Sequence, residues 1–169
     1  MAATLEMILR SRDERQRLQR ELLDLYPDHA LVVATVVVPG AEKRTETSLR
    51  IATAMESALA SAYDGIIERF DRRDLETGYE AFLLVSCDGQ EAKRRAVAAE
   101  EAHPLGRLFD IDVIGRDGVP MSRTASGVSS RRCLICGNDA RVCMRLRSHS
   151  VEELTEHIQR MTDGYFRGV

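Results

Sequence analysis

The chain has 169 residues, of which 44% are apolar and 30% are charged, and it contains no tryptophan. This balance is typical of a globular protein of one ordinary domain, and it excludes a largely disordered or membrane-embedded chain. The net charge of −3 argues against a nucleic acid as partner, and no stretch approaches the ~20 apolar residues that span a membrane.

The start of the chain and its four cysteines indicate a cytoplasmic protein. No long apolar run and no cleavage site follow the first methionine, so we expect no secretory signal and a cytoplasmic location. In that reducing compartment, cysteines serve as metal ligands, redox groups or core residues more often than as disulfides.

Two helices and one strand are expected in the first part of the chain. Ser11, with a glutamate three positions later, matches a capping box and predicts a helix that runs to about Leu25. Residues 31–38 are almost all apolar and β-branched, which predicts a strand buried on both faces. A helical period then extends from about Thr47 to Arg69.

Strands and helices alternate in the second part. Residues 80–87 predict a strand, and 90–102 predict a short alanine-rich helix. Residues 107–115 alternate in polarity, and a turn at 116–118 indicates a hairpin that returns along a short strand at 119–123.

The last helix completes an α+β pattern. A second capping box, Ser150 with Glu153, predicts a helix to about Thr162. We therefore expect a single domain over residues 1–169, with two layers: a mixed sheet of about four strands and helices packed on one face. A Cys-rich segment, residues 131–149, lies within this domain near its C-terminus.

Asp110 and Asp112 are the strongest candidates for catalysis. They stand two apart in a predicted strand, so both side chains lie on one face, while Phe109, Ile111 and Val113 point into the core. Paired carboxylates repel each other unless a cation lies between them, and their oxygens suit Mg²⁺ or Mn²⁺, which would also bind substrate phosphates. The alternative is a half-exposed strand whose outer face happens to be acidic.

Basic residues near this pair in the sequence indicate a site that binds a polyphosphate. Guanidinium groups bind diphosphate oxygens in pairs, and a strand-to-helix turn presents backbone N–H groups to phosphate. Each of these residues taken alone is also compatible with a solvated surface charge. The candidates are Arg107, Arg123, Arg131 and Arg132 around the acidic strand, Lys43 and Arg44 after the turn at Gly40, and Arg12 and Arg15 on the first helix.

The Cys-rich segment could hold zinc. Cys133, Cys136, Cys143 and His149 have the ligand types of a structural Zn²⁺ site, although the spacing is not that of a standard zinc finger. A redox pair formed by Cys133 and Cys136, or plain core packing of the cysteines, are the alternatives. Cys87, at the end of a strand, is expected to be a packing residue.

His103 precedes a Pro-Leu-Gly turn and is a candidate general base towards an incoming hydroxyl. A structural histidine at a helix end is the alternative. The residues by themselves do not decide between these two roles.

Several of these segments resemble one known family. HPLGRLFDIDV at 103–113, the Ser-Arg pair at 122–123 and RRCLICGNDARVC at 131–143 are similar to the citrate lyase holo-acyl-carrier-protein synthases, also called apo-citrate lyase phosphoribosyl-dephospho-CoA transferases. SRDERQ at 11–16 and VVVPGAEKRTE at 36–46 match the same family in the same order, so the likeness spans most of the chain.

The resemblance implies a reaction and its partners. The donor would be 2′-(5″-triphosphoribosyl)-3′-dephospho-CoA, the acceptor a serine of the apo acyl carrier (gamma) subunit of citrate lyase, and the released product diphosphate. Asp110 and Asp112 would hold Mg²⁺ or Mn²⁺ and act in catalysis with Arg107 and His103. The substrate-binding set would be Gly40, Lys43, Gly106, Arg123, Arg131, Arg132, Arg12 and Arg15.

Two other functions fit the residues. A zinc-stabilised module that binds a protein partner would need neither aspartate. A general nucleotidyltransferase would accept an ordinary nucleoside triphosphate as readily as the CoA-derived donor.

Overall fold

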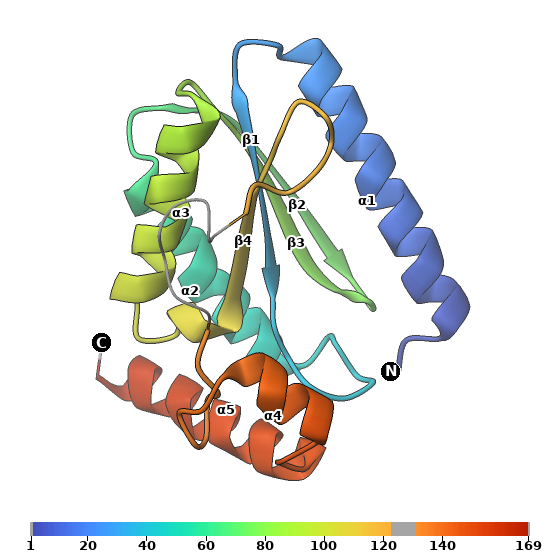
Figure 1. The fold of residues 1–169 in the computed structure, drawn as a ribbon, viewed down its shortest axis with the longest axis vertical. Helices are drawn as coiled ribbons and strands as arrows, with labels where there is room; N and C mark the ends of the chain where they lie inside the picture. The colour runs from blue at the N-terminus through green and yellow to red at the C-terminus, as the bar shows by residue number, and fades with distance from the viewer. Residues whose placement is uncertain (1, 123–130, 169) are drawn as a thin grey trace.

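A computed structural model describes residues 2–122 and 131–168 (Figure 1). The four strands are β1 (Ala30–Val36), β2 (Ile67–Leu75), β3 (Gly78–Val85) and β4 (Phe109–Ile114). The helices are α1 (Leu5–Leu25), α2 (Glu46–Ala62), α3 (Gly89–Ala102), the 3₁₀ turn η1 (Gly106–Leu108), α4 (Ala140–Leu146) and α5 (Val151–Arg167). The α+β class with four strands is confirmed.

The sheet has the order β2-β3-β1-β4, and all of its pairings are antiparallel, so the expected mixed sheet is corrected. The difference comes from β2, which begins inside the helix predicted to run to Arg69 and continues to Leu75, where no element was predicted. β2 and β3 form a tight hairpin that turns at Gly78, where φ is +123° and glycine is favoured. β4 is an edge strand beside β1.

Helices cover both faces of the sheet, rather than one face of a two-layer domain. On one face α2 and α3 bury the larger core, which includes Val32, Leu83 and Ile111. On the other face α1 packs Leu22 and Leu23 against a smaller cluster from β1, β3 and β4. Figure 1 shows α1 separated from α2 and α3 by the sheet.

The two capping boxes had different outcomes. Ser150 and Glu153 cap α5 reciprocally, as predicted, although α5 continues past Thr162 to Arg167. The first helix instead begins at Leu5 with Thr4 as its N-cap, so Ser11 lies inside α1. Ser11 is buried there because its hydroxyl faces the sheet rather than a helix end.

The predicted hairpin after β4 is reduced to a single bridge between Ile114 and Pro120 among the described residues. Hydrogen bonds of 2.8 Å from the Gly115 N–H to Val119 and from the Met121 N–H to Val113 flank this bridge. The Cys-rich segment with α4 and α5 lies at one end of the sheet (Figure 1). α5 is fixed to α2 by an Arg50–Asp163 ion pair of 2.6 Å. In the part of the chain that the structure describes, no helix is both long and apolar enough to cross a membrane.

Candidate functional site

Asp110 and Asp112 lie on the face of β4 that α1 covers. Their neighbours Phe109 and Ile111 are buried in the core on the opposite face, as an alternation of period 2 requires. The side chains of Asp110 and Asp112 are 46% and 41% exposed, so both carboxylates are accessible to a ligand.

The same face of the sheet is polar at one end and apolar at the other. Asp110 stands opposite Thr35 of β1, and Thr35 stands opposite Glu80 of β3, so a polar row crosses three strands. Glu80 is buried, and its carboxylate accepts a hydrogen bond of 2.8 Å from Arg15 of α1. Asp112 marks the boundary, because its partner Val33 belongs to the apolar cluster.

Of the two predicted phosphate-binding residues of α1, Arg15 contacts this polar row through Glu80. Ser11 points at the sheet, and Glu14 bonds Arg73 on β2, so that flank of α1 faces β2. Helix residues are about 100° apart, which puts Arg12 on the opposite flank, turned towards β4. Arg12 is exposed, whereas Arg15 is anchored on Glu80. α1 therefore supplies one fixed and one exposed guanidinium.

The edge of β4 carries a second set of charges. Glu100 of α3 is buried and accepts hydrogen bonds from the backbone N–H of Ile111 at 2.9 Å and from Arg131 at 2.6 Å. Arg131 also pairs with Asp110 at 3.3 Å. Glu100 thus stabilises the open edge of β4 and holds Arg131 beside the aspartate.

Lys93 of α3 completes the surroundings of Asp112. Its ammonium is 3.9 Å from the Asp112 carboxylate, and the lysine is almost fully buried. Burial raises the pKa of Asp112, and the negative charge of Asp110 raises it further, while Lys93 opposes the shift. A raised carboxyl pKa beside a second carboxylate is the expected sign of a site that would gain from a bound cation.

The residues present fit a magnesium ion. Mg²⁺ is commonly held by one or two carboxylates, with water and substrate phosphates as its remaining ligands. Asp110 and Asp112 supply such a pair on an accessible strand face.

The other predicted phosphate ligands are dispersed. Lys43 donates to the carbonyl of Val38 at 2.7 Å, and burial lowers its pKa. Arg44 forms a two-pronged pair with Asp74 at 2.8 Å. Arg132 is exposed and donates to the Gly137 carbonyl within the Cys-rich segment.

Arg107 is half-buried in η1, directly before the acidic strand. Arg123 lies outside the described residues. The structure therefore brings Arg131 to Asp110 and anchors Arg15 on the polar row through Glu80, whereas Lys43, Arg44 and Arg132 have their partners elsewhere.

The two predicted glycines have structural reasons of their own. Gly40 has a φ of +77°, a conformation that favours glycine. A Cβ at Gly106 would lie only 1.9 Å from the carbonyl oxygen of Glu100, so η1 can approach α3 only without a side chain there.

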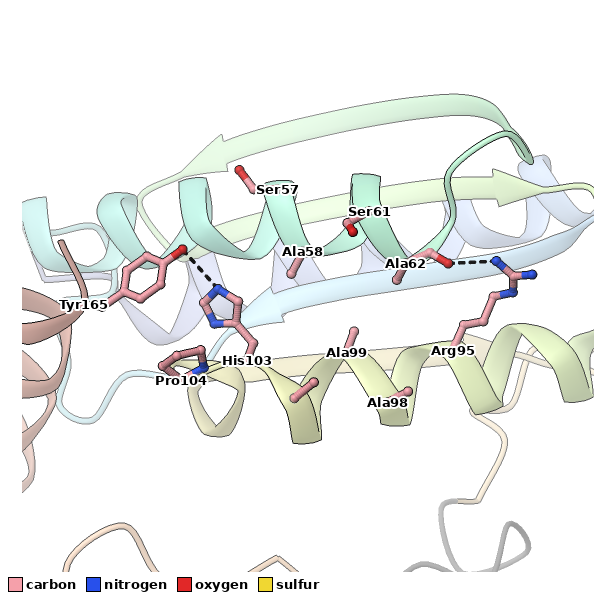
Figure 2. Close-up of a pocket in the computed structure, with 11 residues that line it drawn as sticks. Ser57, Ala58, Ser61, Ala62, Arg95, Ala98, Ala99, His103, Pro104 and Tyr165 are labelled. Carbon is pink, nitrogen blue, oxygen red and sulfur yellow. Dashed lines mark hydrogen bonds between the residues drawn. The ribbon is translucent and has the colours of Figure 1, made fainter. Parts of the chain in front are cut away.

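His103 lies on the opposite side of the sheet from the aspartates. Its ring packs on Phe109 and Tyr165 with centroids 4.9 Å from each, and its Nε2 lies 3.3 Å from the Tyr165 hydroxyl. His103 and Tyr165 close one end of a groove of about 480 Å³ between α2 and α3, lined mostly by the small side chains of alanine and serine, with Arg95 at the other end (Figure 2). Burial lowers the pKa of His103, so the ring is neutral at pH 7.

The cysteines and histidine of the Cys-rich segment converge on one point. Ligand atoms of Cys133, Cys136, Cys143 and His149 all lie within 4.8 Å of one another, a group that could hold a metal ion such as zinc. The Cys136 and Cys143 sulfurs are 3.4 Å apart, and His149 Nε2 is 3.3 Å from Cys136 Sγ. A tetrahedral ion with Zn–S bonds of about 2.3 Å needs sulfur separations of about 3.8 Å, so small adjustments suffice.

Local backbone structure builds this cluster. Cys133 accepts the Gly137 N–H and donates to the Asn138 carbonyl, which closes a tight turn at Gly137, where φ is +71°. The backbone N–H of Asn138, then His149 and Cys143, lower the pKa of Cys136 to about 6, while hydrogen bonding to Cys136 raises that of Cys143 to about 11. Four converging ligands favour metal binding over a redox pair, which needs only two cysteines.

Comparison with known proteins decides the family. A model of the family described as apo-citrate lyase phosphoribosyl-dephospho-CoA transferase matches residues 3–165. The chain belongs to this family. The family inferred from the sequence motifs is thereby confirmed.

Relatives from distant bacteria agree. A probable apo-citrate lyase phosphoribosyl-dephospho-CoA transferase of Streptococcus pyogenes serotype M18 is 38% identical, with 98% of this chain and 88% of that protein aligned. The protein of the same description from Vibrio cholerae serotype O1 (strain M66-2) is 34% identical, with 98% and 94% aligned. Protein CitXG of Haemophilus influenzae is 32% identical over 96% of this chain, which spans 35% of that longer protein.

Sequence reasoning missed two residues of this transferase-family site. Lys93 and Glu100 are charged residues of an alanine-rich helix, where charged side chains are usually solvated, and they reach the aspartates only because α3 packs along the edge of β4. The one available signal was their spacing of seven, which places both on one helix face.

Proposed function

We propose that the protein transfers the phosphoribosyl-dephospho-CoA group from 2′-(5″-triphosphoribosyl)-3′-dephospho-CoA to a serine of the apo acyl carrier subunit of citrate lyase. The observation that carries this proposal is the family match over residues 3–165, which includes the aspartates, Arg131 and the metal cluster. The accessible carboxylate pair flanked by guanidiniums supports it independently.

The reaction exchanges a phosphoanhydride bond of the donor for a phosphate ester bond to the carrier. The serine oxygen forms a bond to the phosphorus attached to the ribose, the bond from that phosphorus to the diphosphate breaks, and the serine proton is released. The donor brings a polyphosphate, and negative charge builds up on the diphosphate as its bond to phosphorus breaks, so the site must hold and neutralise anionic charge.

Asp110 and Asp112 would hold Mg²⁺, or Mn²⁺ in its place. When bound, the ion supplies positive charge to the reacting phosphate oxygens and the leaving diphosphate. Arg131 is kept in position by Glu100, so it can remain beside the site when Asp110 turns to a cation. Arg12, on the facing flank of α1, would bind the outer phosphates.

Lys93 has a supporting role in this scheme. Its ammonium lies beside Asp112 at 3.9 Å in a buried position, where charge interactions are weakly screened. It would keep Asp112 ionised when the site holds no cation. The polar row of Thr35 and Glu80 then orients Arg15 behind the phosphates.

Mass spectrometry of the carrier tests the proposal. Apo carrier incubated with the donor, Mg²⁺ and the enzyme should gain the mass of one phosphoribosyl-dephospho-CoA unit, and Asp110→Asn should abolish the gain while the fold stays intact. ATP and CTP serve as alternative donors. Transfer from these nucleotides at a rate equal to that from the CoA-derived donor, or none from the latter, would refute it.

We also propose that the Cys-rich segment binds a structural Zn²⁺ through Cys133, Cys136, Cys143 and His149. The ligand convergence supports this, and such ions stabilise short segments that have little core of their own. Elemental analysis should find one zinc per chain. Cys143→Ser should lose it and lower the melting temperature, whereas Cys87→Ser, in a thiol outside the cluster, should retain it. Zinc-free wild-type protein with an unchanged melting temperature would contradict this.

A further inference from the structure

The Cys-rich segment is basic in a chain that is acidic overall. Residues 131–149 contain a single acidic residue, Asp139, while the whole chain has a net charge of −3. The five arginines of this segment are Arg131, Arg132, Arg141, Arg145 and Arg147. Such a local excess favours an acidic partner at this place without making the whole protein a general polyanion binder.

α4 presents both charge and apolar area to solvent. Cys143 is buried and faces the metal cluster, so at about 100° per residue Arg141 and Arg145 lie near the centre of the outward face. Apolar side chains flank them on both sides. These are Val142 and Leu146, which are 51% and 69% exposed, and Met144, which is 76% exposed.

This surface adjoins the acidic site. Arg131, at the start of the Cys-rich segment, contacts both Asp110 and Glu100. At the other end of the segment, Val151 lies against the loop that follows β1, 3.3 Å from where a Cβ at Gly40 would stand. A macromolecule bound to α4 would therefore lie next to the carboxylate pair.

We infer that the outward face of α4 is the docking surface for the apo acyl carrier subunit. The carrier would bind it through an acidic patch with apolar side chains that lies beside the carrier's acceptor serine. This inference rests on the proposed function, which requires a protein acceptor close to Asp110. Exposed apolar residues around arginines are typical of protein interfaces. Residues 131–149 contain no Phe, Tyr or Trp on which bases could stack, and His149 belongs to the Cys-His group, which disfavours a single-stranded nucleic acid.

Charge reversal tests the surface. In Arg141→Glu/Arg145→Glu, the dissociation constant for the apo carrier, measured without donor, should rise at least tenfold. The KM for the carrier should rise in parallel, with the KM for the donor unchanged. The matched control is Arg17→Glu/Arg20→Glu on the exposed side of α1, which makes the same change in net charge and should alter carrier binding less than twofold.

A second variant separates docking from folding. Met144→Ser/Leu146→Ser keeps the charge and should weaken carrier binding severalfold, with zinc content and melting temperature like those of the wild type. Carrier binding unchanged in both α4 variants, or equally weakened in the α1 control, would overturn the docking surface. Absence of transfer by the wild type would instead refute the proposed function, because donor-free binding is measured separately.

Discussion

Replacing Asp112 by asparagine separates the effect of the carboxylate pair on protein stability from its role in the transfer reaction. The pKa of Asp112 is raised by burial and by Asp110, so the folded protein holds a proton on this group more tightly than the unfolded chain does. Its contribution to stability is therefore present at low pH and is lost as the pH rises through its folded pKa. Asp112→Asn cannot ionise, so the variant should not lose this stability as the pH rises. Part of the gain is offset because the attraction between the Asp112 carboxylate and Lys93 at 3.9 Å disappears with the charge.

The expected change in stability is small and the expected change in activity is large. Because the side chain is 41% exposed, the gain in unfolding free energy at pH 7 should be at most about 1 kcal/mol, and it should vanish towards pH 4. Loss of one of two cation ligands should slow transfer by about 10²–10³-fold, or about 3–4 kcal/mol in the barrier.

Two assays check this pair of effects. Thermal unfolding between pH 4 and 8 measures the stability difference, and transfer to the carrier under donor saturation measures the rate. Ser86→Ala, a substitution on an exposed residue after β3, is the control and should change neither quantity appreciably. Wild-type turnover in Asp112→Asn, or a loss of several kcal/mol in stability at pH 7, would refute the reasoning.

Three further outcomes follow from the same contacts. Glu100→Ala should lower the free energy of unfolding, measured in denaturant titrations, by about 2–4 kcal/mol, because it leaves the Ile111 N–H and Arg131 without their buried acceptor. Glu100→Gln should lose less than half of that amount. Gly106→Ala should cost at least about 2 kcal/mol, since its Cβ would overlap the Glu100 carbonyl; a melting temperature equal to that of the wild type would show that η1 can move away. His103→Gln should lower stability by about 1 kcal/mol through loss of the Tyr165 contact but leave the transfer rate within threefold; a large fall in rate with normal stability would restore His103 as a catalytic base.

Local patterns predicted the parts of the site that lie within one element. Alternation alone put Asp110 and Asp112 on one strand face, and ligand type and spacing brought together Cys133, Cys136, Cys143 and His149. Both depend on short stretches of backbone, for which periodicity is a direct consequence of geometry.

Features set by tertiary packing were not predictable in the same way. The helix predicted to run to Arg69 included the start of β2, whose charged residues hide the alternation of an edge strand. Ser11 matched a capping pattern but lies within α1. Its hydroxyl contacts Glu80, which is 69 positions away in the chain, so the local sequence could not reveal this partner. His103 was expected to act in catalysis with Asp110, yet its ring packs on Phe109 at the other face of the sheet.

The most direct test of the carboxylate site is a crystal structure of the enzyme with the CoA-derived donor and Mn²⁺. Anomalous scattering should place manganese between Asp110 and Asp112, with the triphosphate between β4 and the Arg12 flank of α1. Manganese bound away from both aspartates, or a triphosphate seated in the groove beside His103, would contradict the account.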